Sequence, residues 1–311
     1  MKKSFLILFI LLNLYTFAQE KKIITTAISV NPLLNGTLFS PEKINSKTRL
    51  VILIAGSGPT DRNGNQTGAV NNSLKLLAEN LAKEDIVVFS YDKRIIAQMK
   101  TGLVDEKNLS FEDFIDDAKS VTKFFKTKNQ YSKIIIAGHS EGALIGMVAA
   151  KDLADGYISL DGAGRSIDKV IAEQIQKQAP AMKEEVQSYF EILKSGKTFE
   201  LKNKMLGSIF RESVQPYMIS WIKYNPQIVI KELKIPVLII NGTKDLQVSV
   251  TDANLLKTAK EDAKLEIITD MNHIFKEIRG DNTANLASYN NPDLPVIIPL
   301  ISVLTQFIKS L

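Results

Sequence analysis

The stretch from Lys133 to Ala150 reads KIIIAGHSEGALIGMVAA. An apolar run (Lys133–Ala137) precedes a Gly-x-Ser-x-Gly pentapeptide centred on Ser140, and a helical pattern of small residues (Ala143–Ala150) follows it. Strand, sharp turn and helix form the context in which such a serine sits exposed on a strained elbow, with glycines leaving room for the turn. We therefore predict that Ser140 is a nucleophile. The backbone N–H of Glu141 would then lie at the positive end of the next helix.

A serine hydroxyl needs a base to take its proton, and the chain contains 2 histidines. His139 lies inside the elbow, where the turn aims it away from the serine hydroxyl. His273 lies in the segment Met271–Phe275, a few residues after the last expected strand. A loop at a strand end is the right place for a base, so His273 is predicted as the base.

The acid that orients this histidine has two candidates. Asp245 follows the expected strand Val237–Asn241, where its carboxylate can accept the ring N–H of His273. Asp161, at the end of the strand after the elbow, is the alternative. Asp270 is too close to His273 along the chain to align with its ring. Loop position favours Asp245.

An oxyanion hole requires two preorganised donors. The N–H of Glu141 is one candidate. The other is expected from the glycine-rich loop Gly56–Pro59 after an early strand, with Ser57 as first choice and Gly58 as second. The alternative is that this loop is a plain glycine turn.

The composition excludes several classes of function. With 0 cysteines, the chain has no disulfides, cysteine nucleophiles or thiolate metal sites, and its few histidines argue against a histidine-rich metal site. The net charge is +5 over 311 residues, without a basic stripe interleaved with aromatics, so nucleic acid is not expected as a partner. Oligomeric state stays open.

The N-terminus predicts export. Two lysines, a short apolar core and the small residue Ala18 form a secretory signal peptide over residues 1–18, with cleavage before Gln19. An uncleaved anchor is the alternative, but the apolar run is short for a membrane span. We expect a secreted or periplasmic protein with no stable membrane insertion after cleavage.

Short apolar runs alternate with helical patterns and predict an α/β fold with a mostly parallel sheet. The runs cover residues 50–55, 86–91, 133–137, 157–161, 237–241 and 265–269, and residues 23–30 and 36–39 suggest an antiparallel opening pair. Residues 166–226 lack a convincing strand and contain the only tryptophan, Trp221. We expect a core of residues 19–165 and 227–311 and a helical cap of residues 166–226, placed as a lid over the strand ends. An ordinary helical subdomain is the alternative.

Two further motifs carry a family resemblance. Residues 56–65 read GSGPTDRNGN and residues 91–94 read YDKR. With the elbow, the Gly-Thr-Lys-Asp loop and the Asn-His-Ile-Phe segment, the chain from Gly36 to Leu311 resembles α/β-hydrolases of the serine-aminopeptidase-like (hydrolase 4) group. It is close to bacterial carboxylesterases with a GSGPxDRxGN loop. Ile95 stands where that group has glycine, so the backbone there can differ.

The resemblance implies a helical cap, a triad of Ser140, Asp245 and His273, and esterase activity towards short acyl chains. Four charged residues of the two motifs have two possible roles: Asp61, Arg62, Asp92 and Arg94. They either bind substrate or form an ion-pair lattice that orders the oxyanion loop, and we favour the lattice.

The sequence thus predicts a serine carboxylesterase acting on a small-molecule ester, with no cofactor and no metal. A peptidase of the same fold is the first alternative. An exopeptidase would need a carboxylate for the substrate ammonium, for which Glu184, Glu185 and Glu191 of the cap are weak candidates. A non-catalytic binding protein on the same scaffold is the second alternative.

Overall fold

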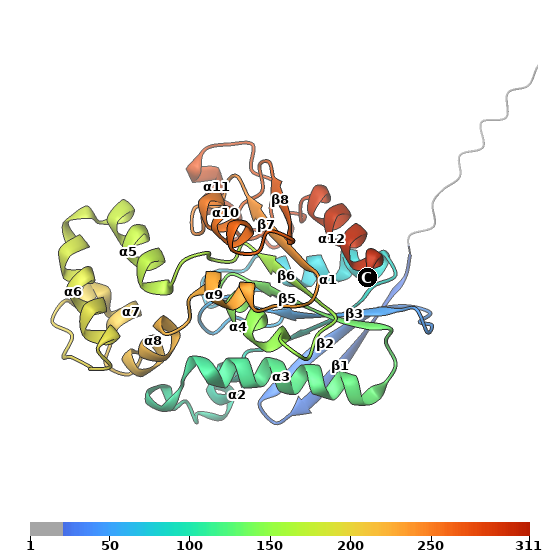
Figure 1. Cartoon of the computed structure of the whole chain (residues 1–311), viewed down its shortest axis with the longest axis horizontal. Coiled ribbons are helices and arrows are strands. Elements are labelled where there is room, and N and C mark those ends of the chain that lie inside the picture. Colours follow the sequence, from blue (N-terminus) through green and yellow to red (C-terminus); the bar gives the residue numbers. More distant parts are fainter. Residues whose placement is uncertain (1–20) are drawn as a thin grey trace, which may run out of the picture.

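A mixed sheet forms the centre of the molecule (Figure 1). The computed structural model describes residues 21–311, so the predicted signal peptide, residues 1–18, lies outside the described residues. The strands are β1 (Ile23–Asn31), β2 (Leu34–Pro41), β3 (Arg49–Ile54), β4 (Val87–Tyr91), β5 (Lys133–His139), β6 (Gly156–Leu160), β7 (Val237–Gly242) and β8 (Lys264–Ile268). Across the sheet their order is β1-β2-β4-β3-β5-β6-β7-β8.

The six strands from β4 to β8 in this order run parallel, while β1 pairs antiparallel with β2 and β2 pairs antiparallel with β4. These findings confirm the predicted α/β class and the antiparallel opening pair. The carboxyl ends of parallel strands meet at one edge of a sheet. The loops that follow β3, β5, β6, β7 and β8 therefore share that edge, and each of them carries a predicted site residue or its alternative.

Helices cover both faces of the sheet. Outside the segment between β6 and β7 they are α1 (Ser73–Lys83), α2 (Arg94–Thr101), η1 (Glu106–Asn108), α3 (Phe111–Lys128), α4 (Glu141–Ala150), α10 (Val250–Ala259), α11 (Asn282–Ser288) and α12 (Ile298–Ser310). Ser110 and Asp113 form the reciprocal capping box that starts α3, which fixes where this long helix begins.

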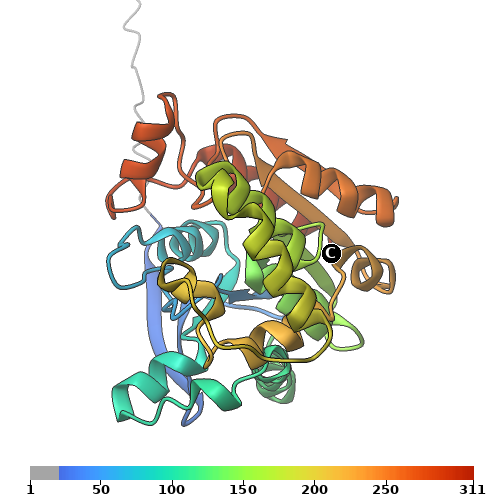
Figure 2. The ribbon, with the colours of Figure 1, turned by 90° about the vertical axis from the view of Figure 1, so that its left-hand side faces the viewer.

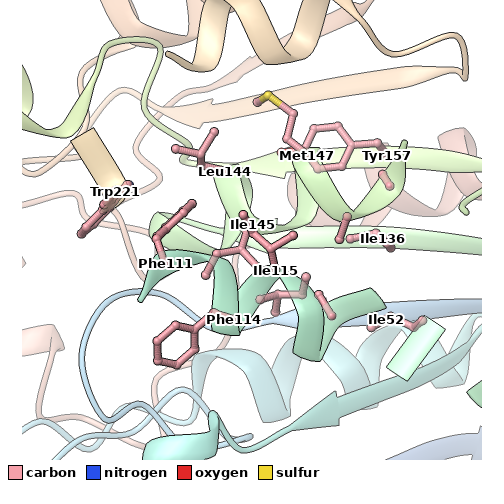
Figure 3. Packing of buried hydrophobic residues seen from close by; sticks show 14 of the residues in the cluster. Ile52, Phe111, Phe114, Ile115, Ile136, Leu144, Ile145, Met147, Tyr157 and Trp221 are labelled. Atoms are coloured by element: carbon pink, nitrogen blue, oxygen red, sulfur yellow. The ribbon is translucent and has the colours of Figure 1, made fainter. Parts of the chain in front are cut away.

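Alternate residues of the central strand point into two separate hydrophobic cores. Ile134 and Ile136 of β5 pack with α3 and α4, whereas Ile135 and Ala137 pack with α1 and α12. Figure 3 shows the first core, where Ile115 of α3 meets α4 and the sheet. Burial on both faces explains why the parallel strands read as continuous apolar runs.

The chain between β6 and β7 forms a separate group of helices. They are α5 (Ile167–Gln178), η2 (Pro180–Met182), α6 (Lys183–Lys194), η3 (Lys204–Leu206), α7 (Gly207–Phe210), α8 (Gln215–Ile222) and α9 (Pro226–Lys231). Residues 166–226, all of them described, contain no strand. In Figure 1, α5 to α8 lie beyond one end of the sheet, and Figure 2 views the molecule from that side, with α5 and α6 in front of the sheet. We call α5 to α8 the cap.

The cap is held to the core by contacts between α8 and α3. The rings of Trp221 and Phe111 stack with centroids 5.4 Å apart, and the backbone N–H of Phe111 donates to Ser220 Oγ at 2.7 Å. Within the cap, the buried amide of Gln215 bonds to the backbone of Phe199 and Phe210. These contacts fix the cap over the strand ends. No helix within residues 21–311 combines the length and the apolar character needed to cross a membrane.

Candidate active site

Ser140 occupies a strained backbone position at the end of β5. Its φ is 55° and its ψ −119°, a region that side-chain-bearing residues rarely adopt. The turn is closed by glycines, because a Cβ at Gly138 would lie 2.0 Å from the carbonyl oxygen of Gly142. Ser140 caps α4 without using its own hydroxyl as a cap. The hydroxyl is therefore left for another role, and Ser140 lines a cavity.

The structure brings His273 and Asp245 together. Nδ1 of His273 lies 2.7 Å from Oδ2 of Asp245, and both side chains are buried. The other carboxylate oxygen of Asp245 accepts the backbone N–H groups of Gln247 and Val248 at 2.7 and 2.9 Å. Asp245 is thus locked from one side and aimed at the imidazole from the other, the arrangement that fixes one tautomer of a histidine base.

His139 contacts His273 from inside the elbow. Its Nε2 donates to the backbone carbonyl of His273 at 2.8 Å, and the two ring centroids are 4.7 Å apart. Burial lowers the pKa of His139 to about 3, with a smaller contribution from His273. A neutral His139 has a single ring N–H, and this hydrogen bond uses it.

The alternative acid, Asp161, lies beside the pair and has different partners. Its Oδ1 accepts from Asn241 Nδ2 at 2.9 Å and from the N–H of Gly242 at 3.0 Å. Its Oδ2 meets no hydrogen-bond donor among the described residues. Burial, together with the negative charge of Asp245, holds the pKa of Asp161 well above its ordinary value. Asp161 is therefore suited to be a neutral carboxyl, whereas Asp245 contacts the histidine.

Three metal-ligating side chains meet at this edge of the sheet. Atoms of His139, Asp161 and His273 lie within 4.8 Å of one another. The hydrogen bonds already described engage all three residues, and those of the two histidines use a ring nitrogen each. We assign the cluster to hydrogen bonding rather than to metal binding.

The predicted oxyanion loop passes directly against the elbow. A Cβ at Gly56 would lie 3.2 Å from Cβ of Ser140, closer than ordinary van der Waals contact, so the loop leaves little room for a side chain there. Ser57 and Gly58 line the same cavity as Ser140 and Glu141. Glu141 is the first residue of α4, where backbone N–H groups have no partner within the helix. The residues that carry the candidate donors thus line a common space.

That space is a cavity of ≈ 390 Å³ between the strand ends and the cap. Its wall is mostly apolar, with Leu144 and Phe114 from the core and Met218 and Trp221 from α8. Its charged lining is already paired: Glu106 bonds to Arg211, Lys93 to Glu141, and Arg165 to Glu173 and Asp252. The cavity suits a compact apolar group placed next to Ser140.

The charged residues of the two motifs pair with one another and with α3. Arg62 donates to both oxygens of Asp92 at 3.0 and 2.7 Å. Arg94 binds Asp117 at 2.7 Å and Asp113 at 2.6 Å, and Asp61 accepts backbone N–H groups within its own loop. Arg62, Asp92 and Arg94 thus form ion pairs as favoured from the sequence, whereas Asp61 makes no ion pair among the described residues. Ile95 lies in the first turn of α2 and lines the cavity.

Comparison with known sequences finds proteins similar to this chain. The family model described as serine aminopeptidase, S33 (Hydrolase_4), matches residues 69–197, which include Ser140 but not Asp245 or His273. A curated relative, esterase EstD of Thermotoga maritima, is 29% identical over 241 residues, covering 75% of this chain and 56% of that protein. The chain therefore spans little more than half the length of this relative.

Solved structures agree on the fold. Est1E of Butyrivibrio proteoclasticus superposes with a TM-score of 0.56 at 16% identity, covering 92% of this chain and 96% of that one. The Pyrococcus furiosus esterase PF2001 gives a TM-score of 0.54 at 15% identity, covering 93% and 91%. This chain has the α/β-hydrolase fold. The comparisons confirm the predicted fold and the resemblance to the serine-aminopeptidase-like group.

Two charged residues near the cavity were missed by the sequence reasoning. Arg165 links the start of the cap to Asp252 of α10 with bonds of 2.9 and 2.7 Å, and nothing in its sequence context suggests this. Lys93 lies buried at the cavity wall against Glu141. Lys93 belongs to the motif Tyr91–Arg94, but the sequence of the motif does not show which of its charged side chains points toward the cavity.

Proposed function

We propose that this protein is a serine carboxylesterase that hydrolyses short-acyl esters through an acyl-enzyme. The observation that carries the proposal is the buried contact of His273 Nδ1 with Asp245 Oδ2 at the sheet edge where the strained elbow presents Ser140 to an apolar cavity. The similarity to a curated esterase supports the same activity. In this proposal Ser140 is the nucleophile, His273 the base and Asp245 the acid.

Acylation begins when His273 Nε2 takes the proton of Ser140 and Oγ attacks the ester carbonyl carbon. The carbonyl oxygen becomes negatively charged and is held by the backbone N–H of Glu141 and that of Ser57, with Gly58 as the alternative donor. Asp245 stabilises the imidazolium that forms. His273 then gives its proton to the leaving alcohol, and the acyl group stays on Ser140.

Deacylation repeats the sequence with water as the nucleophile. His273 takes a proton from water, the resulting hydroxyl attacks the acyl carbon, and the proton returns to Ser140 as the carboxylic acid leaves. Every step uses side chains and backbone of this chain, so the proposal requires no cofactor and no metal. The substrate is a small-molecule ester.

An ester substrate is favoured over a peptide by the charges around the cavity. An exopeptidase needs a free carboxylate to hold the substrate ammonium. Among the described residues that line the cavity, the carboxylates Glu106 and Glu141 are both bound to cations of the protein, and Glu184, Glu185 and Glu191 of the cap lie outside this lining. An exopeptidase therefore finds no free carboxylate for its ammonium site among the described residues of the cavity wall.

The test is hydrolysis of p-nitrophenyl acetate, butyrate and octanoate by the mature protein beside the variant Ser140→Ala. We expect turnover by the wild type, none above background in Ser140→Ala, and the highest kcat/KM with acetate or butyrate. Alanine p-nitroanilide, which has a closely related leaving group on an amide, should be cleaved far more slowly.

Each part of the proposal has its own contradicting result. Equal rates for wild type and Ser140→Ala would exclude the serine mechanism. A clear preference for octanoate would exclude the short-acyl substrate class and leave the esterase intact. Faster cleavage of the anilide than of the esters would favour the peptidase. Absence of any turnover would favour a non-catalytic binding protein.

We also propose export of the protein, on the basis of the N-terminal sequence of residues 1–18. Fractionation of the native organism should locate the chain outside the cytoplasm with Gln19 as its first residue. A cytoplasmic chain that retains Met1 would contradict export.

A further inference from the structure

Lys93 is a buried cation beside the proposed catalytic centre that the mechanism above does not use. It follows β4 and directly precedes α2, and it is 3% exposed. Its neighbours in the sequence, Asp92 and Arg94, are bound by Arg62 and Asp117 respectively. Lys93 alone turns toward the elbow.

The ammonium of Lys93 contacts the two segments that carry the predicted oxyanion donors. Nζ donates to the carbonyl oxygen of Gly56 at 3.1 Å. It also donates to the carboxylate of Glu141, which is 5% exposed. A third contact places Nζ 4.6 Å from the ring centroid of Phe114, within the range of a cation–π interaction. One charged group thus joins the loop after β3 to the first residue of α4.

The contact with Gly56 bears on the donor of the next residue. The carbonyl of Gly56 and the N–H of Ser57 belong to the same peptide unit, which is trans, as are all peptide bonds in residues 21–311. In a planar trans peptide the C=O and the N–H point in opposite directions. By holding the carbonyl, Lys93 sets the direction of the Ser57 N–H away from itself. A cation on the carbonyl also polarises the peptide and strengthens its N–H as a donor.

The contact with Glu141 bears on the second donor. The backbone N–H of Glu141 is the other predicted donor, and the ammonium of Lys93 binds the side chain of the same residue. A buried ion pair is weak evidence for stability, because the free-energy cost of removing both charges from water can exceed the gain from their mutual attraction. Because this pair links the two segments that carry the predicted oxyanion donors, we look for its role in positioning them.

We propose that Lys93 is a positioning residue that fixes the backbone donors of Ser57 and Glu141 for the developing oxyanion. This inference rests on the proposed esterase function. It places the effect of Lys93 in the transition state, because the oxyanion exists there and not in the bound ester.

The test is the variant Lys93→Met, which keeps an unbranched side chain and removes the ammonium. The matched control is Lys123→Met, at an exposed lysine of α3. We expect Lys93→Met to lower kcat for p-nitrophenyl acetate about 100-fold, the order found when one oxyanion donor is lost, with KM changed less than about 3-fold. A trifluoromethyl ketone that forms a tetrahedral adduct on Ser140 should lose affinity by a similar factor. Lys123→Met should match the wild type.

Two results would overturn the proposal in a folded Lys93→Met protein. One is wild-type kcat and ketone affinity. The other is a raised KM with kcat unchanged, which would make Lys93 a substrate-binding residue. The wild type and Ser140→Ala are measured alongside, so a failure of the esterase proposal shows in the wild type, before any variant of Lys93 is compared.

Lys93→Met leaves the buried carboxylate of Glu141 without its cation, and this change alone can prevent folding. The double variant Lys93→Met/Glu141→Gln removes both charges and is the decisive protein in that case. We expect it to fold and to keep the loss in kcat and in ketone affinity. Recovery of wild-type kcat in the double variant would show that Lys93 serves only to neutralise Glu141 and would overturn the proposal.

Discussion

His139 Nε2 donates a hydrogen bond of 2.8 Å to the backbone carbonyl of His273. This bond joins the residue before the proposed nucleophile to the backbone of the proposed base. His139 also packs edge-on against Phe275, with ring centroids 4.9 Å apart, so its ring is held on two sides. The elbow and the loop that carries His273 come from distant parts of the chain, and this hydrogen bond holds them next to each other.

The donor of His139 is therefore expected to matter more than its ring. His139→Phe keeps an aromatic ring against Phe275 and loses the N–H, whereas His139→Gln keeps an N–H at a similar reach. We expect kcat for p-nitrophenyl acetate to fall about 10-fold in the phenylalanine variant, in line with one neutral hydrogen bond. It should stay within about 3-fold in the glutamine variant. The reverse order would show that ring packing, not the hydrogen bond, positions His273.

The lowered pKa of His139 predicts a pH dependence of stability. Burial holds this pKa at about 3 in the folded protein, against 6.5 when unfolded. Below pH 6.5 the unfolded chain therefore binds a proton that the folded chain does not, and stability falls as the pH falls. The contribution of His139 is about 1.4 kcal/mol per pH unit between pH 6.5 and the folded pKa. Above pH 7 the contribution of His139 to the free energy of unfolding no longer changes with pH.

Urea unfolding of the wild type and His139→Phe at pH 4.5 and pH 7 measures this contribution. The phenylalanine variant lacks the titrating group, so its stability should depend less on pH by about 2 to 3 kcal/mol over this interval. The comparison between proteins cancels the titration of groups elsewhere. Equal pH dependence of the two proteins would show that His139 is not kept neutral by burial.

Asp245 and Asp161 offer a contrast between two buried carboxyls with different partners. Asp245→Asn replaces an acceptor facing His273 Nδ1 by a group that can donate, which favours the wrong tautomer of the histidine. We expect kcat to fall by about 10⁴-fold, as when the acid of a serine triad is replaced in this way. Kinetics with p-nitrophenyl acetate measure the loss.

Asp161→Asn is the matched control for this substitution. Burial and the charge of Asp245 raise the pKa of Asp161, which favours the neutral carboxyl that an amide resembles. The hydrogen bonds from Asn241 and Gly242 can be accepted by the amide oxygen. We expect kcat within about 10-fold of the wild type. Equal losses in both variants would contradict the assignment of Asp245 as the single acid.

Much of the fold was predictable because each strand has a local signal. Residues 134–137 of β5 and 237–240 of β7 are uninterrupted apolar runs, since both faces of the sheet are covered there, and the elbow glycines mark the turn after β5. The cap boundary was harder to place. The sequence predicts that the core resumes at residue 227, and this boundary falls inside helix α9, which begins at Pro226 and packs against α4 and α10. Local patterns do not record which distant helix an apolar face will meet.

The site was predictable where one residue type was scarce and less so where it was common. With 2 histidines in the chain, His273 followed by elimination. The charged residues gave no such help: among 39 basic side chains, the sequence could not single out Lys93 as the one that meets Gly56 and Glu141. That contact depends on how β4 and β3 are placed side by side, which is a property of the assembled sheet.

The elbow glycines give the sharpest prediction about stability. A Cβ at Gly142 would lie 2.5 Å from the carbonyl oxygens of Ile54 and Ala55, and both oxygens belong to backbone that cannot move without shifting β3. We expect Gly142→Ala to destabilise the protein by more than about 3 kcal/mol, beyond the usual range for overpacking by one methyl group.

The matched control is Gly207→Ala in α7, because a Cβ there would meet nothing within 4 Å among the described residues and φ is −63°. Alanine at that helical position should leave stability unchanged or raise it by up to about 1 kcal/mol. Urea unfolding followed by far-UV circular dichroism compares the three proteins, and a Gly142→Ala protein as stable as Gly207→Ala would mean that the elbow is not packed against β3 as described.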